Sequence, residues 1–150
     1  ELRELHAYGT SIHLPTEGPL VLPRLEHLTA FYSDEPGKWL KVQLPAVSVF
    51  RTACGGGTWA PLVVAMPNVR ELQIDAGWSD ADSDFAELAR RFLEPEAAAW
   101  WPKLRTLRYT CRPHLLPQLG VGHAVSAAAA ARLREALSRA RSEVGLVVDS

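Results

Sequence analysis

The sequence has few of the features that are typical of disulfide-rich extracellular proteins, membrane proteins or nucleic-acid-binding proteins. It has two cysteines, and its 16 Lys and Arg residues are nearly balanced by 17 Asp and Glu, for a net charge of −1. Two cysteines cannot build a disulfide framework. The balanced charge gives no electrostatic reason to expect nucleic acid or an anionic membrane. No stretch approaches the ~18 consecutive apolar residues of a membrane-spanning helix. We therefore expect no nucleic-acid partner and no membrane partner.

What is present is the composition of a folded domain. Hydrophobic residues make up 47% of the 150-residue chain and charged residues 22%, proportions that argue against disorder. A chain of this length buries roughly 68–70% of the surface that its extended form exposes. It begins with Glu1-Leu2-Arg3 rather than with Met or a leader sequence. We expect it to be part of a longer protein, cut within a repeated unit so that its first strand lacks a neighbour.

A nine-residue pattern recurs through the chain and is the strongest signal in the sequence. The pattern is apolar-Pro-x-apolar-x-x-apolar-x-(apolar or small), and its prolines are 22, 22 and 35 residues apart. The opening residues Leu2 to Ala7 match its second half. Self-similarity at a fixed period of this size is typical of repeat architectures. The full copies start at Leu22, Leu44, Met66 and Trp101, with prolines Pro23, Pro45, Pro67 and Pro102.

The spacing predicts one short strand in each unit. We count positions from the apolar residue two places after the proline, which is Leu25 in the first full copy. Positions 1, 4 and 6 are then apolar. Alternation along a strand places positions 4 and 6 on one face and positions 3, 5 and 7 on the other. A proline before the strand fixes φ where no N–H is needed. Since a unit of ~22 residues cannot bury its apolar face alone, neighbouring units must stack, with their strands parallel.

The L-x-x-L-x-(L) core at this period resembles the leucine-rich repeat. The units depart from it in two ways: Ala7, Ala30 and Thr52 take the third apolar position, and the Asn or Cys usual at position 9 is replaced. Degenerate Pro-x-Leu-x-x-Leu units are similar to those in the C-terminal region of fungal-type F-box proteins. The resemblance implies an α/β solenoid of about five or six parallel strands with irregular connections. Position 9 holds Thr10, Ser33, Gly55, Gly77 and Arg112.

We expect the repeat units to fill residues 1–112, and a helix with a closing strand of the same solenoid to fill residues 113–150. The long fourth unit predicts a helix that begins at a capping pair, Asp84 and Glu87, and ends at Pro95. A second helix is predicted from about Ser126, its N-cap, to about Arg141, followed by a strand over 144–148. The apolar helix faces are Phe85, Leu88, Ala89 and Phe92 in the first, and Ala129, Leu133, Ala136, Leu137 and Ala140 in the second.

The strand face opposite the core is the candidate binding surface, because repeat folds commonly bind partners on the extended face of their sheet. Positions 3, 5 and 7 bring together aromatic, arginine and carboxylate side chains, types that are prominent in protein interfaces. The alternative is an ordinary solvated face whose aromatic residues are covered by loops. The predicted protein-binding residues are Glu4, His6, Tyr8, His27, Thr29, Phe31, Arg51, Glu71, Gln73, Asp75 and Arg108.

No catalytic, cofactor-binding or metal-binding residue is predicted. His6 and His27 fall on adjacent strands near Glu4, but zinc needs three or four ligands in tight geometry, so we interpret both as surface histidines. Gly55-Gly56-Gly57 lacks the phosphate-binding pattern and is interpreted as a turn with no helix behind it. The acidic stretch from Asp75 to Asp84 does not match a calcium loop and is typical of the start of a helix.

The cysteines and tryptophans have structural interpretations. Cys54 and Cys111 both fall at position 8, two strands and roughly 9–10 Å apart, which exceeds the ~7 Å Cα limit of a disulfide. Free thiols fit a reducing compartment, so we expect a cytoplasmic or nuclear location. The tryptophans fall mostly in the connections, where we expect them to fill the side opposite the strand face. They are Trp39, Trp59, Trp78, Trp100 and Trp101.

These features predict a non-catalytic protein-recognition domain rather than an enzyme. The resemblance implies the target-binding part of an F-box subunit of a ubiquitin ligase. Such a subunit binds a protein target on its strand face and a Skp-type adaptor through an F-box that lies outside this chain. Two alternatives stay open: a structural or immune-receptor-type repeat segment unrelated to ubiquitin, and a small α/β enzyme. The enzyme predicts a deep pocket with titratable groups of perturbed pKa, whereas the repeat predicts an open sheet.

Overall fold

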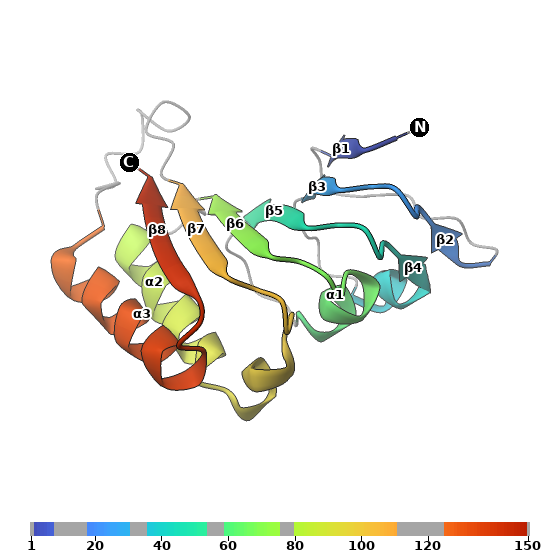
Figure 1. Ribbon diagram of the computed structural model, residues 1–150. Helices are drawn as coiled ribbons and strands as arrows, with labels where there is room; N and C mark the ends of the chain where they lie inside the picture. The colour runs from blue at the N-terminus through green and yellow to red at the C-terminus, as the bar shows by residue number, and fades with distance from the viewer. Residues whose placement is uncertain are drawn as a thin grey trace.

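The main element of the fold is one large parallel β-sheet (Figure 1). The computed structural model describes residues 2–7, 18–30, 36–53, 59–75, 80–110 and 125–149. Six strands follow one another across the sheet in chain order, and each pairs in parallel with the next. The predicted α/β class with parallel strands is therefore confirmed. The strands are β1 (Glu4–Ala7), β3 (His27–Ala30), β5 (Val49–Ala53), β6 (Glu71–Asp75), β7 (Thr106–Thr110) and β8 (Gly145–Asp149).

Helices and two further short strands occupy the connections. β2 (Leu20–Val21) and β4 (Val42–Gln43) pair in parallel as a separate two-stranded sheet. The helices α1 (Ala60–Ala65), α2 (Ala81–Phe92) and α3 (Ala127–Ala140) lie along one side of the large sheet in Figure 1. Two 3₁₀ helices, η1 (Pro36–Lys41) and η2 (Pro95–Ala99), complete the described elements.

The short helix α1 corrects the interpretation that no helix follows the glycine run. The helix spans six residues and carries a proline, Pro61, in its first turn. Proline is favoured there because the first N–H groups of a helix have no partner within it. Pro61 and Leu62 are buried against the core, so packing stabilises a helix too short to form alone.

The strand register is the predicted one through the first five strands. Glu4 lies opposite His27, and Glu71 lies opposite Thr106, which places position 3 of each unit against position 3 of its neighbour. The position 4 residues form an apolar column across the sheet, and those of β5, β6 and β7 are fully buried. The column consists of Leu5, Leu28, Phe50, Leu72, Leu107 and Leu146.

The prolines belong to turns that precede the strands. The N–H of Leu104 donates to the carbonyl of Trp101 at 2.8 Å, with Pro102 at the second position of the turn. That position favours proline because the turn fixes φ near the value of the ring and uses no N–H there. Equivalent bonds join Leu25 to Leu22 at 3.4 Å and Val47 to Leu44 at 3.3 Å.

The last unit makes the same turn without a proline. The N–H of Val144 donates to the carbonyl of Arg141 at 2.9 Å, so Arg141 takes the place that apolar residues hold in the other turns. Arg141 is 4% exposed, and its guanidinium pairs with Glu143. It also donates to the backbone carbonyls of Ala97, Trp100 and Trp101. A buried arginine thus attaches the last unit to the preceding one through polar contacts.

Arg141→Ala should lower the free energy of unfolding by about 3 kcal/mol, since buried carbonyl groups lose a charged donor. Urea denaturation followed by circular dichroism measures the change. The matched control is Arg139→Ala, which removes an exposed arginine bonded to Glu135 one turn away on the same helix and should change stability by less than about 0.5 kcal/mol. Equal losses in the two variants would contradict the structural role of Arg141.

The core between the sheet and the helices is rich in aromatic residues. The ring centroid of Trp59 lies 5.4 Å from that of Trp100 and 5.7 Å from that of Trp101. The guanidinium of Arg91 lies 4.9 Å from the centroid of the Trp59 ring, a cation–π contact. These three tryptophans and Trp39 are all buried. The expected filling role is therefore confirmed for the four tryptophans that the structure describes.

Helix α2 begins earlier than predicted. Its N-cap is Asp80, whose side chain accepts the N–H of Ser83 at 2.9 Å, and the prediction of a start at Asp84 is wrong. Asp84 lies inside the helix, is 3% exposed, and accepts a hydrogen bond of 2.7 Å from the hydroxyl of Tyr109 on β7. Several Asp residues in this stretch can cap a helix. Asp84 is not the cap, because its side chain bonds to Tyr109 instead. The predicted Ser126 cap of α3 is confirmed.

Acid should weaken the fold partly through Glu87 on α2. Its hydrogen bond with Arg90 lowers the pKa of Glu87 from 4.5 to about 2. Because this pKa is lower in the folded chain than in the unfolded one, the ionised carboxylate stabilises the fold fully above about pH 4.5. That contribution is lost as the pH falls toward 2. Glu87→Gln should therefore lose less free energy of unfolding across this range, as measured by urea denaturation at a series of pH values. Parallel pH curves for wild type and variant would contradict the assignment.

Candidate binding surface

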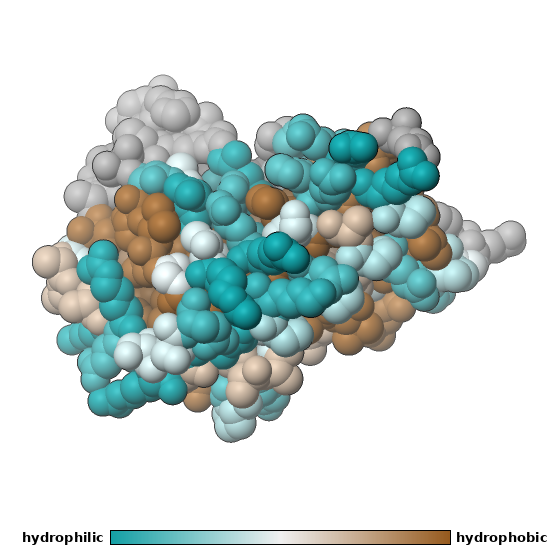
Figure 2. Space-filling view, in the orientation of Figure 1, coloured by the Kyte–Doolittle hydropathy of each residue, from teal (hydrophilic) through white to brown (hydrophobic). Residues whose placement is uncertain are grey.

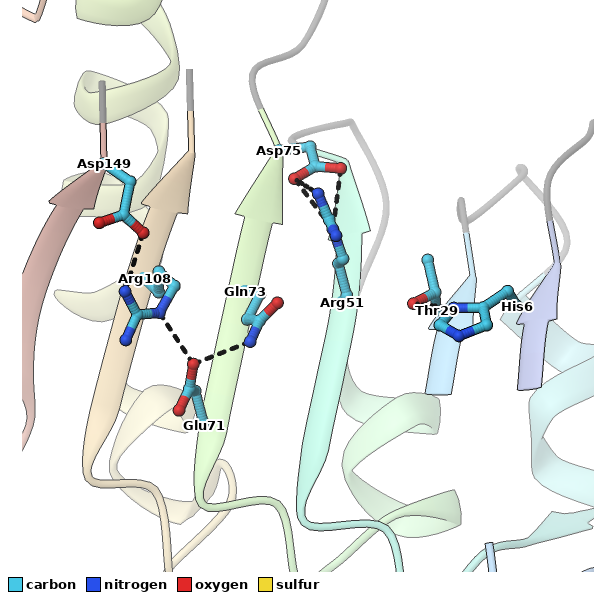
Figure 3. A network of polar contacts seen from close by, with 8 residues as sticks. All are labelled: His6, Thr29, Arg51, Glu71, Gln73, Asp75, Arg108 and Asp149. Carbon is cyan, nitrogen blue, oxygen red and sulfur yellow. Dashed lines mark hydrogen bonds and ion pairs between the residues drawn. The ribbon is translucent and has the colours of Figure 1, made fainter. Parts of the chain in front are cut away.

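The polar positions of the repeat form a continuous face of the sheet. Figure 3 shows side chains of this face projecting from the strands, with the helices behind the sheet. The arrangement follows from the two-residue period of a strand, which turns positions 3, 5 and 7 away from the buried columns. The register places the position 5 residues of neighbouring strands side by side. They are His6, Thr29, Arg51, Gln73, Arg108 and, on the last strand, Val147.

Arg51 on β5 binds the carboxylate of Asp75 on β6. Its Nε lies 3.1 Å from Oδ1 and 3.0 Å from Oδ2, and its Nη2 donates to Oδ1 at 2.8 Å. Asp75 is 7% exposed, which corrects the prediction of an exposed carboxylate. The Arg51 side chain reaches it from the neighbouring strand. The planar guanidinium matches the carboxylate and holds both side chains in one geometry.

Arg108 on β7 links carboxylates on both neighbouring strands (Figure 3). Its Nε donates to Oε1 of Glu71 on β6 at 2.9 Å, and its Nη1 donates to Oδ2 of Asp149 on β8 at 2.8 Å. The hydrogen bond to Asp149, followed by the one to Glu71, raises the pKa of Arg108 above its ordinary value. Gln73 adds a bond of 2.8 Å from its Nε2 to the same Glu71 oxygen. Three adjacent strands are thus connected by side chains on this face.

The first two strands carry a smaller polar group. Nδ1 of His6 lies 3.0 Å from Oγ1 of Thr29, and Nε2 of His6 lies 3.9 Å from Oε2 of Glu4. Glu4, His6 and His27 are exposed, as predicted. Thr29 is not: it is 5% exposed, and it pairs in register with His6 on one side and Arg51 on the other.

Asp149 joins this face although the predicted residues did not include it. Gly145 pairs with Thr106, which holds position 3 of its repeat unit. The last unit is therefore one residue shorter between its turn and its strand than the unit before it. The repeat spacing would bury Val147, whereas Leu146 and Val148 continue the buried columns and Val147 falls on the polar face. The alternation of apolar residues at 144, 146 and 148 was the signal that could have revealed this shift.

Several predicted features lie outside the residues that the structure describes, and the predictions made for them stay predictions. Two of them, Tyr8 and Phe31, belong to the predicted binding face. The remaining features are Cys54, Cys111, the glycine run 55–57, Trp78 and the position 9 residues Thr10, Ser33, Gly55, Gly77 and Arg112.

A concave surface lies on the helix side of the sheet. It is a groove of about 710 Å³ between α2 and α3, where alanines from both helices lie among three arginines. Two of these, Arg90 and Arg139, pair with carboxylates of their own helices. Within the described ranges, no three His, Cys, Asp or Glu side chains gather as a metal site would require. None of the helices in the described part of the chain is long and apolar enough to cross a membrane.

The fold and this face define an α/β protein with helices on one side of a parallel sheet and a polar network on the other. Comparisons with models of known protein families, with curated proteins and with solved structures return no match to the chain. What the protein does must therefore be argued from the surface itself.

A double-mutant cycle should show that Arg51 and Asp75 act as a pair. We expect a coupling free energy of about 2 kcal/mol between Arg51→Ala and Asp75→Ala, because removal of either partner leaves the other without its charged hydrogen bonds. Unfolding of wild type, both single variants and the double variant in urea gives the value. The control cycle combines Asp75→Ala with Arg132→Ala on the exposed side of α3, which should be additive. Additivity in both cycles would show that the contact does not stabilise the fold.

Proposed function

We propose that this protein is a non-catalytic protein-recognition domain, a leucine-rich-repeat-like solenoid that binds a protein target on the polar face of its sheet. Residues 1–112 supply the repeat units, and residues 113–150 close the solenoid with a helix and a strand. The observation that carries the proposal is a pair of neighbouring side-chain clusters on this face, each held in place by its own hydrogen bonds. One joins Arg51 to Asp75 across β5 and β6, and the other joins Arg108 to Glu71, Gln73 and Asp149 across β6, β7 and β8. We propose no catalytic residue, cofactor or metal for this surface.

The network suits recognition because it is ordered before a partner arrives. Immobilising a flexible side chain at an interface costs about 0.5–1.5 kcal/mol, and the fixed side chains of Arg51 and Arg108 avoid much of that loss. The face also keeps unused polar atoms. Oε2 of Glu71 has no hydrogen bond within the described part of the chain, and Arg108 uses two of its three guanidinium nitrogens. A partner with matching donors and acceptors can bind these atoms without breaking the existing pairs.

The wider role that we propose follows from the resemblance to fungal-type F-box proteins. In that role the strand face holds a target in the cytoplasm or nucleus, and an F-box outside these 150 residues joins a Skp-type adaptor and its ubiquitin ligase. The recognition proposal does not depend on this step. Co-purification of a Skp-type adaptor with the product of the complete gene tests it, and absence of the adaptor would favour a structural or receptor-type repeat.

A charge placed at the centre of the face should weaken target binding and leave the fold intact. Gln73 lies on β6 between Arg51 and Arg108, so Gln73→Lys adds a positive charge between two arginines that already have carboxylate partners. We expect the affinity for the target to fall by at least about tenfold, or 1.4 kcal/mol. The control is Ser138→Lys, the same charge at an exposed position on α3.

The experiment compares proteins captured from an extract by wild type, Gln73→Lys and Ser138→Lys, followed by calorimetric titration of each recovered protein. Partners retained by wild type and Ser138→Lys but lost by Gln73→Lys support binding on the polar face. An unchanged set of partners with Gln73→Lys would move the binding surface elsewhere.

A further inference from the structure

The last strand, β8, is an edge of the sheet with an apolar surface. In the part of the chain that the structure describes, β7 pairs with one side of β8 and no strand pairs with the other. Leu146 and Val148 are partly exposed, whereas Leu107 and Tyr109, their neighbours in the same columns on β7, are fully buried. Figure 2 shows hydrophobic surface gathered over the position of β8. Another strand at this edge would complete the burial of both columns.

β8 has outward backbone groups with which no strand in the described ranges pairs. The N–H of Gly145 donates to the carbonyl of Arg105 beside β7 at 2.8 Å. Since N–H and C=O groups alternate in direction along a strand, those of Val147 and Asp149 also face β7. Those of Leu146 and Val148 face outward. The strand pairs with β7 through five consecutive residues with no bulge, and it contains neither lysine nor proline, two residues that discourage pairing at an edge strand.

We propose that β8 joins two copies of this chain in a symmetric dimer, with the two β8 strands antiparallel about Val147. In this register Leu146 of one copy lies opposite Val148 of the other. Each such pair exchanges both of its backbone hydrogen bonds, about four bonds in total, and the outward groups of both residues are satisfied. The proposal concerns the edge of the sheet and does not require the proposed function of its polar face.

The side chains of β8 are complementary to themselves in this register. Apolar residues meet apolar residues at the three central positions, and Val147 lies opposite its own copy. Asp149 lies opposite Gly145, which has no side chain, so the two carboxylates fall at opposite ends of the strand pair. Asp149 is also neutralised by Arg108 within its own sheet. Like charges opposite each other would destabilise the pairing, and this register has none.

A second copy fits better at β8 than a continued parallel stack does. Pairing of β8 with β1 of another copy would leave one free edge at each end, so copies would add without limit. It would also place Val147 beside His6 and Val148 beside Ala7, which buries less apolar surface. The antiparallel pairing of two β8 strands closes after two copies, because each copy uses its β8 edge in the contact.

Sedimentation equilibrium of the 150-residue chain tests the proposal. We expect a single species of twice the 16.5 kDa chain mass at high concentration, dissociating on dilution. Val147→Lys places like charges opposite each other at the symmetry axis and should weaken dimerisation at least about tenfold. Val148→Pro removes an outward N–H on each copy and should also weaken it. The control is Val64→Lys, the same substitution at a 68% exposed position on α1, which should dimerise as wild type does.

A cross-link tests the register directly and does not depend on the stability of the lysine variant. Residues 147 of the two copies form a non-hydrogen-bonded pair with a Cα separation of about 4.5 Å, within the range of a disulfide. In a Cys54→Ser, Cys111→Ser background, Val147→Cys should give a disulfide-linked dimer on mild oxidation, and Val64→Cys should not. A wild-type chain that stays monomeric at its highest soluble concentration would overturn the proposal. So would an open series of larger assemblies, or equal cross-linking at residues 147 and 64.

Discussion

The in-register stacking of one apolar column across six strands is the contact on which the rest of the molecule depends. Phe50, Leu72 and Leu107 are fully buried in that column. Because side chains alternate with a period of two, slipping one strand by one residue would turn these side chains to solvent and bring Arg51 or Arg108 into the core. Burial of an unpaired charge is far more costly than exposure of a leucine. The pairing that forms the core therefore also assembles the polar network, and neither can change its register without the other.

The connections between strands can vary in length, because each one only has to bring the chain back to the start of the next parallel strand. Loop length is thermodynamically inexpensive, so a spacing of 22 residues between prolines and one of 35 are compatible with the same sheet. The longer connection contains α2, which is attached to the sheet by its own contacts. Phe85 lies edge-on to Tyr109 with centroids 4.7 Å apart, and Asp84 accepts the Tyr109 hydroxyl. Each insertion thus extends the core rather than merely bridging two strands.

The parts that could be predicted from the sequence are those that repeat. The prolines and the apolar positions indicated five strands and their register, because turn chemistry and side-chain alternation act within a few residues. Single tertiary contacts were not predictable. Arg141 replaces an apolar residue by donating to carbonyls 40 to 44 residues away, and no local pattern encodes that. Thr29 and Asp75 are buried although side-chain alternation places both on the polar face, and each contacts a side chain of an adjacent strand, which depends on the pairing itself. Asp149 lies on the polar face because the last unit is one residue shorter than the repeat spacing predicts.

The two proposed interfaces differ in the physics of recognition and meet at one ion pair. The polar face carries arginines already neutralised by carboxylates, so it offers little long-range attraction and selects a partner by the placement of hydrogen-bonding atoms. The β8 edge offers backbone groups and apolar area, so it recognises an extended strand with apolar side chains. Arg108 and Asp149 belong to both, because their bond of 2.8 Å spans β7 and β8. Pairing of β8 with a second copy would restrict the Asp149 backbone and so fix the Arg108 guanidinium more firmly. Since a guanidinium held in place loses less freedom on binding, dimerisation and target binding would favour each other through this pair.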